Sequence, residues 1–221
     1  MRVALFGGTF DPPHRAHLTV ARAVAAKFSL DTIFFAPTGR QPLKPQGAVA
    51  GFADRLAMVE LLCDAAQHDF PSARFLPSTL DAPRADGRPN YTIDTLAQLR
   101  AELREQSPNV APSKLFVIIG ADAFLDLRSW RSPDALLQAA EWIVVSRPGF
   151  SLAGLAPLAL TPEQSGKIHL LHEIQETASA SEVRERLQAG LDCSAFLTPE
   201  VLAYIRDHHL YRSQTRGKSS P

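Results

Sequence analysis

The stretch VALFGGTFDPPHRAH, residues 3–17, decides the fold. Its apolar start suits a buried β-strand and leads directly into Gly7 and Gly8, whose missing side chains let the backbone approach a phosphate closely. After the two prolines, apolar residues recur at three- and four-residue spacings, which predicts a helix over residues 13–28. Strand, glycine turn and helix together predict a phosphate site that faces the first amides of the helix.

Two familiar phosphate-binding fingerprints, the P-loop and GxGxxG, are missing from this stretch. The candidate chemistry belongs instead to His14 and His17, whose spacing predicts that they share one helix face. As imidazolium ions or as neutral N–H donors, they would stabilise the charge that a phosphoryl group gains in its transition state. One alternative is zinc, which would need a third ligand that the motif does not supply. The other is structural, with one histidine capping the turn and the other half-buried.

Composition excludes some classes of partner. The 221 residues carry 23 Lys and Arg against 23 Asp and Glu, so no basic field is expected to recruit nucleic acid or a membrane. Cys63 and Cys193 lack metal-ligand spacing and are predicted to be reduced, packed thiols. No apolar window reaches the length of a membrane span, and no secretion signal is recognised, so we expect a cytoplasmic protein without a bound metal site of its own.

Apolar runs of β character alternate with helical patterns, which predicts an α/β fold: a Rossmann-like, doubly wound parallel sheet with a small C-terminal helical part. The predicted strands are Val3–Phe6, Thr32–Ala36, Arg74–Leu76, Leu115–Ile119, Trp142–Val145 and Ile168–Leu171. The predicted helices are Pro13–Phe28, Phe52–Ala66, Tyr91–Gln106, Pro133–Ala140, Ala180–Ala189 and Pro199–His208. Polar segments at Pro37–Gly51, Asp81–Asn90 and Gly149–Gly166 are predicted loops, because strands continue beyond each of them. We expect one domain over residues 1–212 and a disordered tail at 213–221.

A second candidate anion site lies in the sequence SASEVR, residues 179–184. Ser179 and Glu182 have the spacing of a capping box, which alone would only satisfy the amides at a helix start. The functional alternative keeps this cap and adds an anion, which Ser179, Ser181 and the guanidinium of Arg184 would bind together.

These two segments resemble the nucleotidyltransferases whose hallmark is an (H/T)-x-G-H motif. His14 and His17 fit that motif, with Ala16 at the position of its glycine, and residues 179–184 are similar to the family's I-S-x-T-x-I-R segment. The resemblance implies ATP as a substrate and Mg²⁺ held mainly by its phosphates. The ATP-binding residues that it implies are Gly7, Gly8, Thr9, Phe10, His17, Ser179, Ser181 and Arg184.

A third block narrows the resemblance. Residues 87–96, 118–124 and 127–130 are similar to the P-S-Y-T-x-x-T-L, I-G-x-D and L-x-x-W segments of bacterial nicotinate mononucleotide adenylyltransferases, in the same order and at similar spacing. The resemblance covers essentially the whole chain. It implies transfer of AMP from ATP to nicotinate mononucleotide, with small-molecule substrates as the only partners indicated.

The third block also supplies candidates for a pyridine pocket. Trp130 offers a face for stacking, and the amides and hydroxyls near Tyr91 and Thr92, at a predicted helix start, suit a carboxylate. The resemblance further implies that Asp122 contacts the ribose or metal-bound water. The structural alternatives are a packed tryptophan, an ordinary helix cap, and a turn or cap after the strand for Asp122.

The resemblance gives four catalytic candidates: His14, His17, Lys44 and Arg184. Lys44 lies in a glycine-containing loop where it would neutralise phosphate or remain a solvated surface charge, and Leu43 stands where the family pattern has histidine. Arg147, after a predicted strand, is a further candidate for the triphosphate or adenine. Two other functions stay open: an adenylyltransferase for nicotinamide mononucleotide or phosphopantetheine, and a nucleotide sensor without catalysis. The sequence indicates no oligomeric state.

Overall fold

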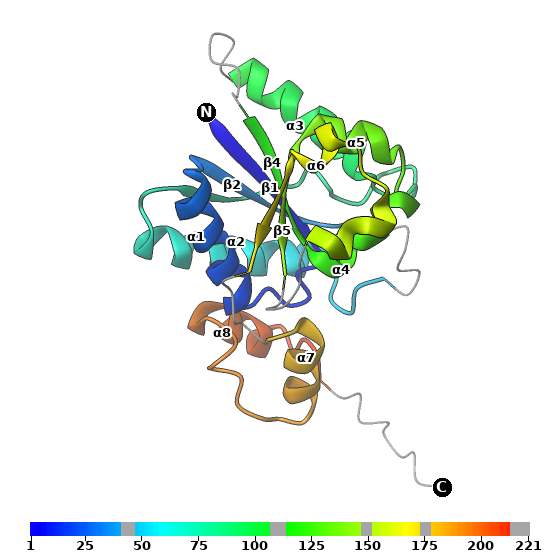
Figure 1. The fold of residues 1–221 in the computed structure, drawn as a ribbon. Helices are drawn as coiled ribbons and strands as arrows, with labels where there is room; N and C mark the ends of the chain where they lie inside the picture. Colours follow the sequence, from blue (N-terminus) through cyan, green and yellow to red (C-terminus); the bar gives the residue numbers. More distant parts are fainter. Residues whose placement is uncertain (41–46, 107–113, 147–151, 173–177, 213–221) are drawn as a thin grey trace, which may run out of the picture.

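A computed structural model describes residues 1–40, 47–106, 114–146, 152–172 and 178–212 (Figure 1). Six parallel strands form one sheet in the order β3-β2-β1-β4-β5-β6, as predicted for an α/β fold. The strands are β1 (Arg2–Gly8), β2 (Thr32–Pro37), β3 (Arg74–Pro77), β4 (Lys114–Gly120), β5 (Glu141–Val145) and β6 (Ile168–Leu171). The predicted tail at 213–221 and parts of two predicted loops lie outside the described residues.

Helices cover both faces of the sheet and its carboxyl end. The α-helices are α1 (Arg15–Phe28), α2 (Phe52–Asp69), α3 (Thr92–Gln106), α4 (Ala121–Leu125), α5 (Pro133–Ala139), α6 (Pro162–Ser165), α7 (Ala180–Gln188) and α8 (Pro199–Asp207). Two 3-10 helices, η1 (Asp126–Ser129) and η2 (Leu152–Leu158), join them. None of the described helices combines the length and apolar character that crossing a membrane requires.

Alternation along β1 divides the core into two layers. Ala4 and Phe6 pack into the cluster formed with α1 and α2, whereas Val3 and Leu5 pack into the cluster formed with α3 and α5. Successive side chains of a strand point to opposite faces, so this central strand anchors both layers.

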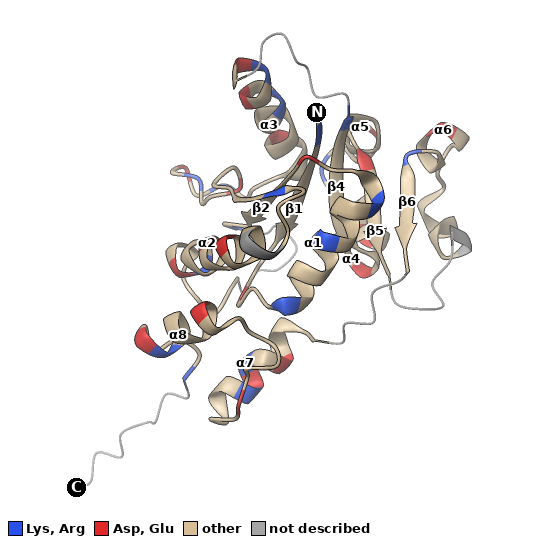
Figure 2. Cartoon of the chain, turned by 90° about the vertical axis from the view of Figure 1, so that its left-hand side faces the viewer, with Lys and Arg blue, Asp and Glu red and all other residues tan. Residues whose placement is uncertain are grey.

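The sheet places a crevice beside β1. The chain winds from β1 toward β2 and β3 in one half of the sheet, and from β4 toward β5 and β6 in the other. In doubly wound sheets, ligands bind at the carboxyl ends of the strands where the order reverses, which here is between β1 and β4. Helices α7 and α8 lie beyond that end of the sheet (Figure 1). Basic and acidic residues are interspersed along the helices in the cartoon of Figure 2.

All six predicted strands are confirmed, and each predicted helix exists within two or three residues of its predicted ends. The first helix begins at Arg15 and not at Pro13, since His14 has extended backbone angles and forms the N-cap. A residue before proline avoids the helical region, which keeps the chain extended until both prolines have passed. The loop prediction for Gly149–Gly166 is wrong over η2 and α6, which are too short to show helical periodicity.

Two loops touch at Gly39, just after β2. Its amide donates to the carbonyl of Asp81 at 2.7 Å, which brings residues 37–40 against the 81–90 segment. A Cβ atom at Gly39 would lie 2.7 Å from Cα of Pro83 and 2.8 Å from the carbonyl carbon of Ala82. Both atoms belong to the backbone, so a side chain at Gly39 would force the loops apart.

We expect Gly39→Ala to lower the free energy of unfolding by about 1–3 kcal/mol, the usual cost of overpacking a close contact. Gly166→Ala is a matched control, since its Cβ would make only ordinary contacts at 3.5 Å and its φ is negative. Urea denaturation of both variants measures the difference. Equal stability of the two variants would show that the Gly39 contact relaxes without cost.

Candidate active site

A cavity of about 260 Å³ opens at the carboxyl ends of β1 and β4. It brings together six of the residues that the sequence nominated for substrates: Gly7, Gly8, Thr9, Tyr91, Thr92 and Trp130. Its floor is apolar and includes Leu5 and Val117. The cavity therefore joins the two glycines at the end of β1 to the start of α3 and to the segment that carries Trp130.

The buried ring of Phe10 packs close to both Gly8 and His17. Phe10 is 2% exposed, and its ring centroid lies 4.9 Å from that of His17. A Cβ atom on Gly8 would lie 3.2 Å from the Phe10 ring, so the turn needs a small residue there. Because the Phe10 side chain belongs to the core, only its backbone remains for the predicted contact with ATP.

The histidine pair is in contact at the start of α1. His14 is the N-cap and His17 the third helical residue, and their ring centroids lie 3.8 Å apart. The amide of His14 donates to Nδ1 of His17 at 3.1 Å. The two imidazoles therefore do neighbour one another as predicted, although only His17 lies within the helix.

Burial makes both imidazoles neutral at neutral pH. Desolvation lowers the pKa of His14 to about 4, and desolvation together with the neighbouring His14 ring lowers the pKa of His17 well below its usual value. Because Nδ1 of His17 accepts a backbone hydrogen bond, the proton of its neutral ring is assigned to Nε2. Of the two sequence-based interpretations, the structure favours the neutral N–H donor over the imidazolium ion.

The amides at the start of α1 are not all available to an anion. The amide of Arg15 donates to the carbonyl of Phe196 at 2.8 Å, and the amide of His17 donates to the carbonyl of His14 at 2.9 Å. The side chain of Arg15 also binds the C-terminal segment, through the carbonyl of Leu197 at 3.0 Å. The prediction that the first amides of this helix face a phosphate is therefore wrong for Arg15 and His17.

Asp11, only 3% exposed, links this loop to distant parts of the chain. Its carboxylate accepts hydrogen bonds from the amides of Val49 and Ala50, at 2.7 and 3.0 Å, and from the hydroxyl of Tyr211 at 2.7 Å. Burial and the bond to Asp11 raise the pKa of the Tyr211 phenol. The carboxylate thus fixes the glycine turn against the start of α2 and against the chain that follows α8.

Two arginines hold the carbonyls of the same loop. Arg55, 2% exposed, donates to the carbonyl of Thr9 at 2.6 Å and to that of Ala50 at 3.2 Å. Arg184 of α7 donates to the carbonyl of Asp11 at 2.7 Å and to Oγ of Ser181 at 3.1 Å. The loop between β1 and α1 therefore lies between guanidinium groups of α2 and α7.

The serine cluster at the start of α7 combines both sequence interpretations. Ser179 is the N-cap, and its Oγ accepts the amide of Glu182 at 3.2 Å, as a capping residue should. Ser181 is exposed, and its Oγ accepts a hydrogen bond from the Nη2 of Arg184, whose Nη1 donates to the carbonyl of Asp11. These residues lie beside the 11–17 segment and outside the cavity lining, so they suit the triphosphate and not the pyridine ring.

Tyr91, Thr92 and Trp130, which the sequence predicted for a pyridine ring, all line the cavity. Tyr91 immediately precedes α3, and its carbonyl accepts the amides of Asp94 and Thr95, at 2.9 and 3.2 Å. Trp130 is partly buried and lines the same cavity. Asp122 is exposed in α4 and does not line the cavity, and its contact with the ribose or with metal-bound water stays a prediction.

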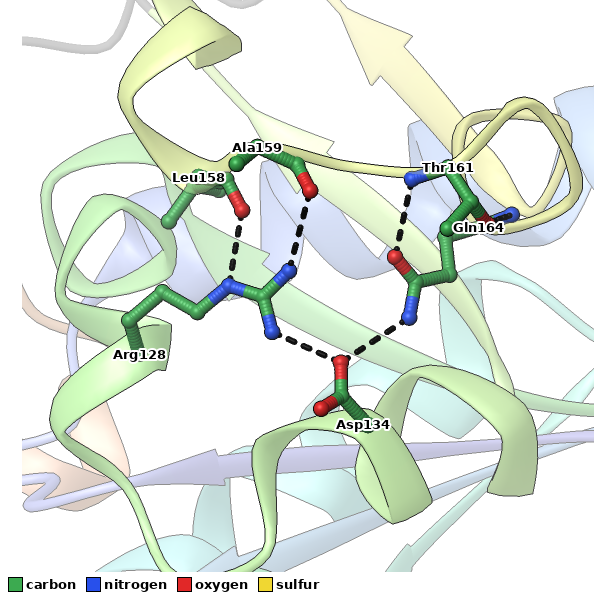
Figure 3. Close-up of polar contacts among 6 residues, drawn as sticks. All are labelled: Arg128, Asp134, Leu158, Ala159, Thr161 and Gln164. Atoms are coloured by element: carbon green, nitrogen blue, oxygen red, sulfur yellow. Dashed lines mark hydrogen bonds and ion pairs between the residues drawn. The ribbon is translucent and has the colours of Figure 1, made fainter.

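A network of hydrogen bonds around Arg128 and Asp134 holds the turn that also contains Trp130; Figure 3 shows this network. Arg128 donates to Oδ1 of Asp134 at 2.7 Å and to the carbonyl of Leu158 at 2.7 Å. Gln164 donates to the same Asp134 oxygen at 3.0 Å. Hydrogen bonds from Arg128 and Gln164 lower the pKa of Asp134. The network closes residues 128–134 into a braced turn that presents Trp130 to the cavity.

Some candidates lie outside the described residues: Lys44, its neighbour Leu43, and Arg147. The sequence analysis missed Asp11, Arg55, Tyr211 and Arg131 as contributors to the site. Asp11 was visible within the motif, but its partners Val49 and Tyr211 follow 38 and 200 residues later. Within the described ranges, no three His, Cys, Asp or Glu side chains gather as metal ligands.

Comparison with known proteins gives consistent matches. Residues 5–186 match the cytidylyltransferase-like family. A probable nicotinate-nucleotide adenylyltransferase of Solibacter usitatus is 38% identical over 212 residues, which cover 96% of this chain and 100% of the relative. One from Chromobacterium violaceum is 38% identical over 96% of this chain and 99% of its own length.

A solved structure has the same fold. Nicotinic acid mononucleotide adenylyltransferase of Plasmodium falciparum, complexed with NaAD, superposes with a TM-score of 0.71 at 20% identity, over 95% of this chain and 97% of that protein. At that identity the match establishes a shared architecture of sheet and helices.

The depressed pKa of His14 predicts a pH dependence of stability. Between about pH 4 and 6.5 the unfolded chain binds a proton at this ring that the folded chain does not. The free energy of unfolding therefore decreases as the pH falls through this window, and is fully restored above it. His14→Asn should flatten part of this slope in urea denaturation at about pH 7 and about pH 5. An unchanged slope in the variant would contradict the assignment of a buried, neutral His14.

Proposed function

Because this chain belongs to the family of nicotinate-nucleotide adenylyltransferases, we propose that it transfers AMP from ATP to nicotinate mononucleotide. The products are nicotinate adenine dinucleotide and pyrophosphate, a step of NAD biosynthesis. The single observation that carries the proposal is the cavity that joins the glycine turn to Tyr91, Thr92 and Trp130. That arrangement suits a mononucleotide whose ring lies at Trp130 and whose phosphate lies toward Gly7–Thr9.

The reaction needs alignment and charge stabilisation more than proton transfer. The nucleophile is a phosphate oxygen of the mononucleotide, which is already ionised and requires no general base. It attacks the α-phosphorus of ATP in line with the departing pyrophosphate. The protein's task is to hold both phosphates at the loop between β1 and α1, and to stabilise the charge that moves onto the leaving group.

His17 and Arg184 divide that task in the proposal. The assigned Nε2 proton of His17 would donate to a phosphate oxygen, because its Nδ1 is already occupied by the His14 amide. Arg184 would bind the triphosphate through donors not used by Asp11 and Ser181. Lys44 remains part of the proposal as a further phosphate ligand, as does the stacking of the pyridine ring on Trp130.

Mg²⁺ belongs to the ATP substrate in this proposal, held mainly by its phosphates. Among the described residues the donor set suits that arrangement: the carboxylate oxygens of Asp11 are occupied by Val49, Ala50 and Tyr211. The ion would neutralise phosphate charge, and no step is assigned to a protein-bound metal. A cytoplasmic location is part of the same proposal, since ATP is supplied there.

Pyrophosphate release with each acceptor in turn tests the function. We expect release with ATP and nicotinate mononucleotide, and a specificity constant at least about 10³-fold lower with nicotinamide mononucleotide, whose amide places donors against donors. Equal use of the two would indicate a dual-specificity or nicotinamide-type enzyme. Release with phosphopantetheine alone would indicate the sister enzyme. ATP binding without any release would indicate a sensor.

His17→Ala should lower kcat by roughly 100-fold or more while changing KM for ATP little, because the lost donor acts mainly on charge that develops in the transition state. Steady-state kinetics at saturating mononucleotide give both constants. His208→Ala, at the far end of α8, is the control for loss of an imidazole as such. If kcat of His17→Ala stays within about threefold of the parent, His17 is a structural residue.

A further inference from the structure

The cavity lining contains a cationic side chain to which the proposed function gives no role. Two of its lining residues are ionisable with a full charge, Asp81 and Arg131. Asp81 is already engaged, since its carboxylate accepts the hydroxyl of Thr95 at 2.7 Å and burial raises its pKa. Arg131 forms no ion pair or hydrogen bond with another described residue.

Arg131 is nevertheless held in place. Its guanidinium carbon lies 4.7 Å from the centroid of the Tyr91 ring, in a cation–π contact across the mouth of the cavity. Arg131 lies in the turn of residues 129–133, and an ion pair of 2.7 Å between Arg128 and Asp134 closes this turn. A braced turn and an aromatic platform therefore position a cation whose hydrogen-bond donors have no partner among the described residues.

The surroundings suit an anionic group on a flat ring. Trp130 and Arg131 both line the cavity, so a ring stacked on the indole would share the cavity with the guanidinium. Tyr91, whose ring lies under the guanidinium, directly precedes α3, and Thr92 is the first residue of that helix, where the helix dipole also favours negative charge. A guanidinium is planar and binds a carboxylate with two parallel hydrogen bonds.

We propose that Arg131 binds the carboxylate of the pyridine ring and determines the preference for the acid over the amide mononucleotide. The inference rests on the proposed function and adds a named specificity residue to it. An amide would present its own N–H donors to the guanidinium and would satisfy neither group. Because the carboxylate is remote from the reacting phosphorus, the contact acts on substrate binding and not on turnover.

The test compares Arg131→Gln with the parent enzyme on nicotinate and nicotinamide mononucleotides at saturating ATP. We expect kcat/KM for the acid to fall roughly 10- to 100-fold, chiefly through KM, as for loss of a charge-assisted bidentate contact. The same constant for the amide should change by less than about threefold. Arg104→Gln, in the exposed last turn of α3, is the matched control and should leave both substrates unaffected.

Arg131→Lys separates charge from geometry, and is expected to fall between parent and Arg131→Gln for the acid substrate. Calorimetric titration of nicotinate mononucleotide alone into each folded variant should show the same order of Kd. Equal losses for acid and amide would place Arg131 on the phosphate that both share, and overturn the proposal. Unchanged constants for both substrates would overturn it as well. Failure of the parent to use either mononucleotide would instead refute the proposed function.

Discussion

The buried carboxylate of Asp11 is the interaction on which the rest of the site depends. Three donors satisfy it, two amides before α2 and the phenol of Tyr211, while its own carbonyl accepts Arg184. A buried carboxylate without such partners would be strongly destabilising. The demand for all these donors draws the start of α2, helix α7 and the chain after α8 onto one loop, and that loop carries the glycine turn and His14.

The electrostatics of the site follow from burial. His17 packs against the rings of Phe10 and His14, and both imidazoles are neutral, so the fixed positive charge near the loop comes from Arg55 and Arg184. A neutral N–H donor needs less desolvation than an imidazolium ion when a phosphate binds beside it. In the proposed reaction, the guanidinium groups would hold the polyanion and the imidazole of His17 would donate a directed hydrogen bond.

The cavity and the loop between β1 and α1 are held in place by different contacts. Arg128, Asp134 and Gln164 brace the turn next to Trp130 on the α5 side of the sheet. Asp11 braces the loop between β1 and α1, beyond the strand ends. Both converge on β1, whose alternate residues anchor the two layers of the core. One strand end therefore sets the position of the cavity relative to the loop between β1 and α1, and the proposed in-line attack would require such a fixed arrangement.

The sequence by itself determined the parts that local pattern encodes. Periodicity in two and in 3.6 residues located all six strands and the longer helices, and the 3–17 stretch identified the glycine turn with its histidine pair. The separate segments at residues 87–96 and 127–130 predicted that Tyr91, Thr92 and Trp130 serve one ring, and the cavity brings these residues together. Short elements such as α4 and η2 were not predicted, because a helix of one or two turns leaves no periodic signal in the sequence.

Only the tertiary structure decided which groups meet. It placed the Phe196 carbonyl on the amide of Arg15, which closes part of the expected anion site at the start of α1. It brought Tyr211 to Asp11 across 200 residues of chain, and set Arg131 over Tyr91. Such contacts join segments that are distant in sequence, so no local propensity or spacing records them. They are selected by the need to satisfy buried charges and polar groups once the sheet has packed.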